Sequence, residues 1–370
     1  MMRELLDGVA PDRYPILWMF LTCFMGFFVA LNAYPSILYI ARSKGLMDEP
    51  ESRSAHQLPT PTLGGIGIFI SIVVVLVLIG AFLDTKMLLL IIGSLTILFF
   101  IGLKDDLAGT SPYNKMFGQL LAASLLLLFT DTRIIGFSGI LGIEQLPYWV
   151  SFVFTLFVYV VITNAYNLID GIDGLAASIA CMASLVMGGV FLMAGQLSLA
   201  IISMTLLGAL LAFLRYNFST KQKIFMGDTG SMVVGFLLAF FVISFINLAQ
   251  TQTLALYSTD APALALAFLF YPLLDTLRVF VLRVFKYHVS PFKADRNHIH
   301  HHILNLGFSH KQATLWITAI NSLIIWIAFH LLDLNLNWQI VLLLGYGSVL
   351  YLLPFLFKMV TDVSLQERNH

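Results

Sequence analysis

Eleven apolar runs of roughly membrane-spanning length constrain this chain more than any other feature. A transmembrane helix needs about 20 mainly apolar residues, and turn residues or charges separate these runs. They lie at about residues 15–40, 65–83, 87–103, 116–130, 147–166, 175–194, 197–214, 231–249, 262–282, 313–332 and 338–357. The sequence therefore predicts an all-α polytopic membrane protein of about eleven transmembrane helices, forming one domain over residues 1–370.

The amino-acid composition argues against a soluble globular protein, a disordered chain and a nucleic-acid-binding protein. Hydrophobic residues make up 59% of the chain and charged residues only 11%, whereas soluble domains average about 25% charged residues. The net charge of zero argues against disorder and against a basic nucleic-acid-binding surface. Cys23 and Cys181 lie inside apolar runs, as buried free thiols do, and the acidic residues before position 13 are untypical of a cleavable signal peptide.

Basic residues predict the orientation. With the N-terminus outside and the C-terminus in the cytoplasm, sixteen of the twenty Lys and Arg residues fall on the cytoplasmic side. Such an excess marks the cytoplasmic face of membrane proteins.

Residues capable of chemistry gather on the same side. A transporter is expected to place its ionisable groups near the bilayer midplane, so this distribution favours an enzyme that uses a cytosolic substrate. A secondary transporter is the non-enzyme alternative. The residues are Lys44, Asp48, Arg53, His56, Asp105, Asp106, Lys115, Asn164, Asn167, Asp170, Asp173, Asp228, Arg296 and a histidine cluster.

An acidic doublet, Asp105-Asp106, ends one apolar run, and Lys115 follows it. Adjacent carboxylates repel each other, and the pKa of one rises unless a cation lies nearby. The pair suits a metal site or a general base. The alternative is that the two aspartates are adjacent by chance in a solvated loop and have no role in catalysis.

A second motif runs from Asn164 to Gly174. On a continuing helix, Asn164, Asn167 and Asp170 share one face. Amides and carboxylates, among them Asp173, at the end of an apolar span indicate a bound ligand. Gly171 and Gly174 have no side chains and so let that ligand approach the backbone. The alternative is that these residues only form a polar helix end followed by glycines, without a ligand.

Asp228 precedes the next apolar run in Phe225-Met226-Gly227-Asp228-Thr229-Gly230-Ser231. A carboxylate at a helix N-terminus is stabilised by the helix dipole. Asp228 is therefore either a helix cap or a site residue.

Histidines cluster beyond the ninth run. His298, His300, His301 and His302 follow Arg296, with His310 downstream. Zinc is one alternative, but no HExxH or spaced-cysteine pattern accompanies them. Beside Arg296, these rings are more typical of donors to phosphate oxygens. The alternative is that they lie in a solvated cytoplasmic loop without a binding role.

Together the carboxylates and amides offer hard oxygen ligands that suit Mg²⁺, with Mn²⁺ as an alternative, and the cations offer anion clamps. The combination indicates phosphoryl chemistry on a pyrophosphate substrate. No Walker or GxGxxG element is present.

From about Asp48 to His310 the chain resembles the polyprenyl-phosphate N-acetylhexosamine-1-phosphate transferase superfamily, and most of all its undecaprenyl-phosphate GlcNAc-1-phosphate transferases. The resemblance implies a multi-pass enzyme of the bacterial inner membrane. It implies transfer of a sugar 1-phosphate from a UDP-sugar to undecaprenyl phosphate, with release of UMP, as the first step of a lipid-linked cell-surface glycan. Another UDP-N-acetylhexosamine is an alternative donor. The sequence does not determine the oligomeric state, and a homodimer is one alternative.

The resemblance also implies residue roles. Asp105 and Asp106 match the doublet that activates or orients the lipid phosphate, and Lys115 matches its basic partner. Asp228 matches the principal Mg²⁺ ligand and Asn167 a second ligand or its neighbour. Gly171, Asp173 and Phe225 match positions at the uridine, and Arg296, His300, His301 and His302 match the basic motif that holds the pyrophosphate or the sugar. Asp48, Arg53 and His56 lie in the loop near the lipid site. Further candidate substrate-binding residues are Lys44, Asn164, Asp170 and His298.

Differences from the motifs of related enzyme families indicate which subfamily the chain resembles. The form Ala294-Asp295-Arg296-Asn297-His298-Ile299-His300-His301 is similar to GlcNAc-1-phosphate transferases and unlike MurNAc-pentapeptide transferases. The chain lacks the Arg and later acids of a CDP-alcohol phosphotransferase. It also lacks the first Gly of the GxGD motif of intramembrane aspartyl proteases.

Overall fold

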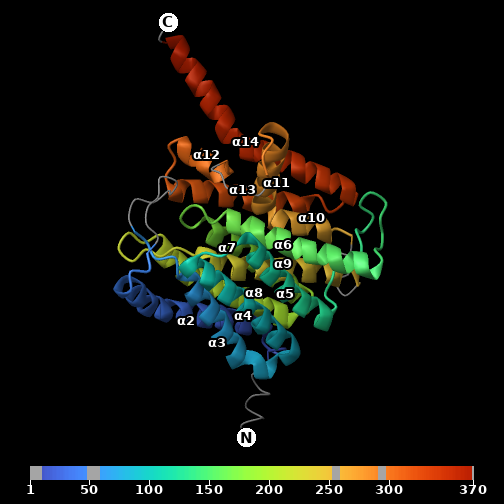
Figure 1. The fold of residues 1–370 in the computed structure, drawn as a ribbon. Helices are drawn as coiled ribbons and strands as arrows, with labels where there is room; N and C mark the ends of the chain where they lie inside the picture. Colours follow the sequence, from blue (N-terminus) through green and yellow to red (C-terminus); the bar gives the residue numbers. More distant parts are fainter. Residues whose placement is uncertain (1–10, 48–58, 252–258, 291–296, 369–370) are drawn as a thin grey trace.

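The computed structural model describes residues 11–47, 59–251, 259–290 and 297–368, with side chains up to residue 353. Within these ranges the chain forms thirteen α-helices and no named strand (Figure 1). They are α2 (Pro15–Ser43), α3 (Gly64–Ile79), α4 (Thr85–Ala108), α5 (Pro112–Thr130), α6 (Tyr148–Leu168), α7 (Leu175–Met193), α8 (Leu197–Asn217), α9 (Gly227–Gln250), α10 (Ala261–Phe268), α11 (Phe270–Val281), α12 (Ile299–Asn305), α13 (His310–His330) and α14 (Leu336–Arg368). Short turns of 3₁₀ and π-helix extend α3 and α11, at Gly80–Phe82 and Leu282–Lys286.

The all-α polytopic prediction is confirmed. Every predicted apolar run coincides with a helix or with the pair α10–α11. In the described part of the chain, nine helices are long and apolar enough to cross a membrane, or ten when the bent pair counts as one span. Helix α5 is the predicted run outside that set. The count of eleven spans and the placement of the termini stay predictions.

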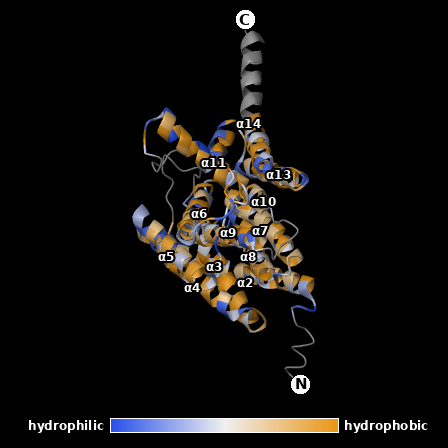
Figure 2. Cartoon of the chain, turned by 90° about the vertical axis from the view of Figure 1, so that its right-hand side faces the viewer, coloured by the Kyte–Doolittle hydropathy of each residue, from blue (hydrophilic) through white to orange (hydrophobic). Residues whose placement is uncertain are grey.

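The outer surface of the bundle is apolar, as a lipid-facing surface requires. Phe20, Phe24 and Phe157 are each at least 60% exposed, whereas soluble proteins rarely leave large contiguous apolar patches uncovered. Figure 2 shows hydrophobic residues along most helices and hydrophilic ones concentrated at helix ends and in loops. The protein is therefore a multi-pass membrane protein.

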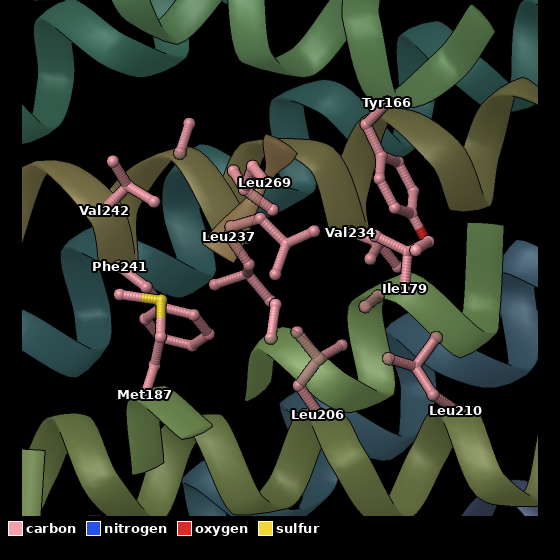
Figure 3. Packing of buried hydrophobic residues seen from close by; sticks show 14 of the residues in the cluster. Tyr166, Ile179, Met187, Leu206, Leu210, Val234, Leu237, Phe241, Val242 and Leu269 are labelled. Carbon is pink, nitrogen blue, oxygen red and sulfur yellow. The ribbon is translucent and has the colours of Figure 1, made fainter. Parts of the chain in front are cut away.

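Helix α9 forms the centre of the bundle. It packs against α3, α4 and α6, and nearly all of its residues are buried. Figure 3 shows Val234, Leu237 and Phe241 of α9 packed with Ile179 and Met187 of α7 and with Leu206 and Leu210 of α8. This burial fixes the axis of α9, and hence the place of Asp228 in its first turn.

The ninth predicted span is bent. Helices α10 and α11 meet at an angle of 80° around Leu269. Pro272 explains the break, because it has no N–H to donate to the carbonyl of Phe268 and its ring crowds that carbonyl. Asn321 of α13 contacts both sides of the break: it accepts from Tyr271 N–H (2.9 Å) and donates to Ala267 O (3.3 Å).

Candidate active site

One end of the bundle holds a cavity of about 490 Å³. The ends of α2, α4, α6 and α9 and the residues preceding α3 meet there. Three motifs that the sequence singled out therefore come together: the acidic doublet, the Asn164–Gly174 motif and the segment around Asp228. We call it the carboxylate cavity; its lining is Gly45, Leu46, Met47, Thr62, Leu63, Asp105, Asp106, Leu107, Asn167, Asp170, Gly227 and Asp228.

Lys115 joins two of the predicted carboxylates. Its Nζ lies 2.7 Å from Asp105 Oδ2 and 2.7 Å from Asp228 Oδ2. The three side chains are between 12% and 23% exposed, so water screens them only partly. Because one ammonium group serves two carboxylates, the cluster keeps a net negative charge that favours binding of a further cation.

Asp106 has different contacts from its neighbour Asp105. Its Oδ1 accepts from the backbone N–H of Asp228 (2.8 Å), and its Oδ2 accepts from Thr229 N–H (3.0 Å) and the Thr229 hydroxyl (2.5 Å). The first N–H groups of a helix have no partner within that helix. Asp106 therefore caps α9 from α4, and this contact holds the backbone of Asp228 in place.

Glycines let the helices meet backbone to backbone around this cap. A Cβ at Gly102, one turn before Asp106, would lie 2.5 Å from Thr229 Cα. A Cβ at Gly65 would collide with Gly230 N. Gly227 has φ +70° and faces Thr62 O and the carboxylate of Asp106, so both its conformation and its surroundings require glycine.

The two amides of the Asn164–Gly174 motif separate in the structure. Asn167 lines the cavity, and its Oδ1 accepts from the Ser231 hydroxyl (2.6 Å). Asn164, a turn earlier in α6, donates to Gln119 Oε1 (2.8 Å) and to Val160 O (2.7 Å). Asn164 is absent from the cavity lining, and its role in binding stays a prediction.

Asp170 lies just beyond the end of α6 and also lines the cavity. Burial raises the pKa of its carboxyl well above the ordinary value, and the negative charges of Asp228, Asp106 and Asp173 raise it further. Within the described ranges no cation pairs with it. A carboxylate in this position is stabilised by a cation that arrives with or as a ligand.

Asp173 lies in the same loop and is paired through one of its carboxylate oxygens. Its Oδ2 lies 2.7 Å from Lys223 Nζ and 3.2 Å from His310 Nδ1. Burial alone would raise the pKa of Asp173, but the hydrogen bonds and charges of His310 and Lys223 lower it. Gly174 N–H donates to Asn217 Oδ1 (2.6 Å), so helices α8 and α13 both hold this loop.

Phe225 anchors the start of α3. Its N–H donates to Pro61 O (2.8 Å), and its carbonyl accepts from Gly64 N–H (2.9 Å). Lys223 Nζ lies 5.2 Å from the centre of its ring. The aromatic ring and the paired carboxylate of Asp173 thus share one cation.

The predicted histidines lie together in residues 297–305, which we call the histidine segment. His298 Nδ1 donates to Asp275 Oδ2 (2.6 Å), and His300 Nδ1 shares a hydrogen bond with Tyr271 Oη (3.2 Å). His302 Nε2 lies 2.9 Å from Asn297 Oδ1, and the His301 ring lies 4.3 Å from that of His300. Among the residues that the structure describes, no histidine lines the carboxylate cavity.

His300 nevertheless reaches the loop that carries Asp170. A Cβ at Gly171 would lie 2.5 Å from His300 Nε2, which shows how closely ring and backbone pack. Burial lowers the pKa of His300 well below its usual value, and the neighbouring histidines lower it further. A neutral His300 ring therefore serves as a packing surface for Gly171.

The remaining predicted residues lie at the edge or beyond the described ranges. Lys44 is exposed at the end of α2, next to Gly45 of the cavity lining. Asp48, Arg53, His56 and Arg296 lie outside the described residues.

The donor set of the cavity fits a divalent cation such as Mg²⁺. In the described part of the chain no three His, Cys, Asp or Glu side chains form a preassembled metal site. Mg²⁺ does not require one, because it is usually held by one or two carboxylates together with substrate phosphates. Asp228, Asn167 and the unpaired Asp170 are the residues that could hold it.

Sequence reasoning missed part of the site. The backbone lining at Gly45, Thr62 and Leu63 carries no chemical signature, and only the fold brings it to the cavity. Asp275 and Tyr271 were missed because they lie inside an apolar run. A charge within such a run is itself a signal, since membrane spans rarely contain one without a partner.

Comparison with known proteins finds one family profile and several named relatives that are similar to this chain. A profile of glycosyl transferase family 4 matches residues 88–246. A probable undecaprenyl-phosphate N-acetylglucosaminyl 1-phosphate transferase of Bacillus subtilis (strain 168) is 32% identical over 288 residues, which is 77% of each chain.

Two further relatives are similar over the same extent. The undecaprenyl-phosphate alpha-N-acetylglucosaminyl 1-phosphate transferase of Escherichia coli (strain K12) is 30% identical over 77% of this chain and 76% of its own. The decaprenyl-phosphate N-acetylglucosaminephosphotransferase of Mycobacterium tuberculosis (strain ATCC 25618 / H37Rv) is 33% identical over 75% of this chain and 74% of its own.

Proposed function

The chain belongs to glycosyl transferase family 4, and on that premise we propose that it transfers GlcNAc-1-phosphate from UDP-GlcNAc to undecaprenyl phosphate and releases UMP. The observation that carries the proposal is the carboxylate cavity, where four aspartates meet at one end of an apolar bundle and Lys115 pairs with two of them. The product would start a lipid-linked glycan at the cytoplasmic face of a bacterial inner membrane.

The residues divide the work by their contacts. Asp228 and Asn167 would hold a divalent cation, and Asp170 is available as a further oxygen ligand. When bound, Mg²⁺ would neutralise the charge that develops on the UMP leaving group. Lys115 lies between Asp105 and Asp228 and is placed to clamp a phosphate oxygen.

Asp105 is the better candidate for accepting a proton from, or orienting, the lipid phosphate. Both oxygens of Asp106 are occupied by the first turn of α9, whereas Asp105 is held by Lys115 at the cavity. The lipid phosphate oxygen then attacks the β-phosphorus directly. Arg296, His301 and His302 keep their proposed role on the donor side of the site. His298 instead binds Asp275, and His300 packs on Gly171.

An assay with purified protein, undecaprenyl phosphate and a panel of UDP-sugars tests this function. We expect UMP release and a diphosphate lipid only when both substrates and Mg²⁺ are present, fastest with UDP-GlcNAc and abolished by EDTA. Faster turnover of UDP-GalNAc would reassign the sugar. Solute uptake into vesicles without any product would support a transporter instead.

The stereochemistry at phosphorus tests direct attack. With a chiral thiophosphate donor, a single displacement inverts the configuration at the β-phosphorus. Retention would instead require two displacements, through a covalent phospho-aspartate.

A further inference from the structure

Asp275 is a fully buried carboxylate that the proposed chemistry does not use. It lies in α11, beyond the 80° bend, and its Oδ1 accepts from the backbone N–H of Ile299 (2.8 Å). Its Oδ2 accepts from His298 Nδ1 (2.6 Å). Both oxygens therefore bind the histidine segment, which follows α11 in the chain.

Neighbouring residues of α11 bind the same segment. Arg278 donates to the carbonyl of Asn297 and lies 3.8 Å from Asp275 Oδ1. Tyr271, one turn before Asp275, shares a hydrogen bond with His300. One face of α11 thus holds residues 297–300 by three side chains.

The contact continues to the cavity. His300 packs so closely on Gly171 that a Cβ there would lie 2.5 Å from its Nε2. Within the described ranges this buried nitrogen has no hydrogen-bond partner. Gly171 lies between Asp170, which lines the cavity, and Asp173, which is paired with Lys223.

We propose that Asp275 is a positioning residue: through His298 and His300 it holds the loop 169–174, and with it Asp170, at the carboxylate cavity. The proposal rests on the function proposed above, because it assigns that cavity to the reaction. It joins the bent membrane helix α11 to the donor side of the site, so a shift of α11 would displace Asp170 without any contact to substrate.

The test compares Asp275→Asn with Thr276→Val in the full-length protein. Asn has the same volume as Asp275. It places an NH₂ group where Asp275 now accepts one of its two hydrogen bonds, and that bond is lost. Thr276 is the matched control, because its hydroxyl is buried next to Asp275 with no hydrogen-bond partner in the described part of the chain, and Val has the same shape. We expect kcat/KM for the UDP-sugar to fall on the order of 10- to 100-fold in Asp275→Asn and to stay unchanged in Thr276→Val.

Two further measurements separate positioning from folding. Hydrogen exchange should quicken in both 297–305 and 169–174 in Asp275→Asn, with the fraction of folded protein unchanged. His298→Asn should keep most activity, because its Nδ2 can replace the His298 Nδ1 donor to Asp275.

Several outcomes would overturn the proposal. Faster exchange confined to 297–305, an unchanged kcat/KM, or a loss fully accounted for by unfolded protein would each contradict it. Because hydrogen exchange does not depend on turnover, wild-type protein that makes no lipid product would refute the proposed function while the loop measurement still tests the Asp275 contact.

Discussion

At the carboxylate cavity one ammonium group, that of Lys115, lies 2.7 Å from two carboxylates, and a third, Asp170, has no cation partner in the described ranges. In the histidine segment, 297–305, the buried carboxylate of Asp275 uses both oxygens on its neighbours. Both regions are dense in ionisable residues. The difference lies in how fully their carboxylates are paired.

Unsatisfied charge beside a cavity indicates ligand binding, whereas a fully bonded buried carboxylate indicates a structural connection. The two regions are also built differently. Glycine backbones bring α3, α4 and α9 together around the cavity, while hydrogen-bonded side chains of α11 hold the histidine segment. Substitutions can test each half of this contrast.

The largest effect is expected at Lys115. In Lys115→Gln the carboxylates of Asp105 and Asp228 lose their shared cation and repel each other, and a substrate phosphate loses its clamp. We expect kcat/KM for UMP release to fall about 10²- to 10³-fold. Lys104→Gln is the control, because Lys104 is an exposed lysine near the end of α4, next to Asp105 in the sequence; an equal loss there would remove the case for a special site at Lys115.

A methyl group at Gly102 should come next. Its Cβ would lie 2.5 Å from Thr229 Cα, so the first turn of α9 has to shift, and displacement of Asp228 costs up to about 10²-fold in kcat/KM. Gly93→Ala on the same helix meets only Leu125 Cδ2 at 3.5 Å and should stabilise α4 by roughly 1 kcal/mol. Equal activity in the two variants would show that the backbone contact does not position Asp228.

The smallest effects are opposite shifts in thermal stability at Asp170 and Asp173. The pKa of Asp170 is raised by burial and nearby carboxylates, so its ionisation costs stability as pH rises above the ordinary carboxyl pKa. Burial also disfavours the charged form of Asp173, but His310 and Lys223 lower its pKa overall. Its contribution is therefore present above the ordinary pKa and lost as pH falls through the lowered one.

At pH 7 and without divalent cation, Asp170→Asn should raise Tm and Asp173→Asn should lower it, each on the order of 2 °C. Asp170→Asn should nevertheless be less active, because the removed carboxylate is the one available to a cation. Shifts of the same sign would mean that the contrast between an unpaired and a paired carboxylate is wrong.

Much of the fold could be predicted from the sequence, because bilayer length and hydrophobic runs fix where helices form. The bend at Leu269 was not predicted, although Pro272 carries a local signal for it. Where the freed backbone groups find partners could not be predicted, because Asn321 reaches them only through tertiary packing.

The candidate site was predicted in its residue types but not in its contacts. Asp105 and Asp106 are equivalent as letters in the sequence, yet adjacent positions on a helix point about 100° apart, and the neighbouring helices decide their roles. Lys115 contacts one of them and α9 the other. Likewise, spacing placed Asn164 and Asn167 on one face but could not show that Gln119 binds the first.

Mg²⁺-dependent UMP release by Asp228→Asn tests the central claim, that the carboxylate cavity is the reaction centre, most directly. Asp84→Asn is the matched control, because Asp84 is also an aspartate at a helix start, where it caps α4. With UDP-GlcNAc, undecaprenyl phosphate and saturating Mg²⁺, we predict a loss of about 10²- to 10³-fold for Asp228→Asn and none for Asp84→Asn. A wild-type rate in Asp228→Asn would contradict the account.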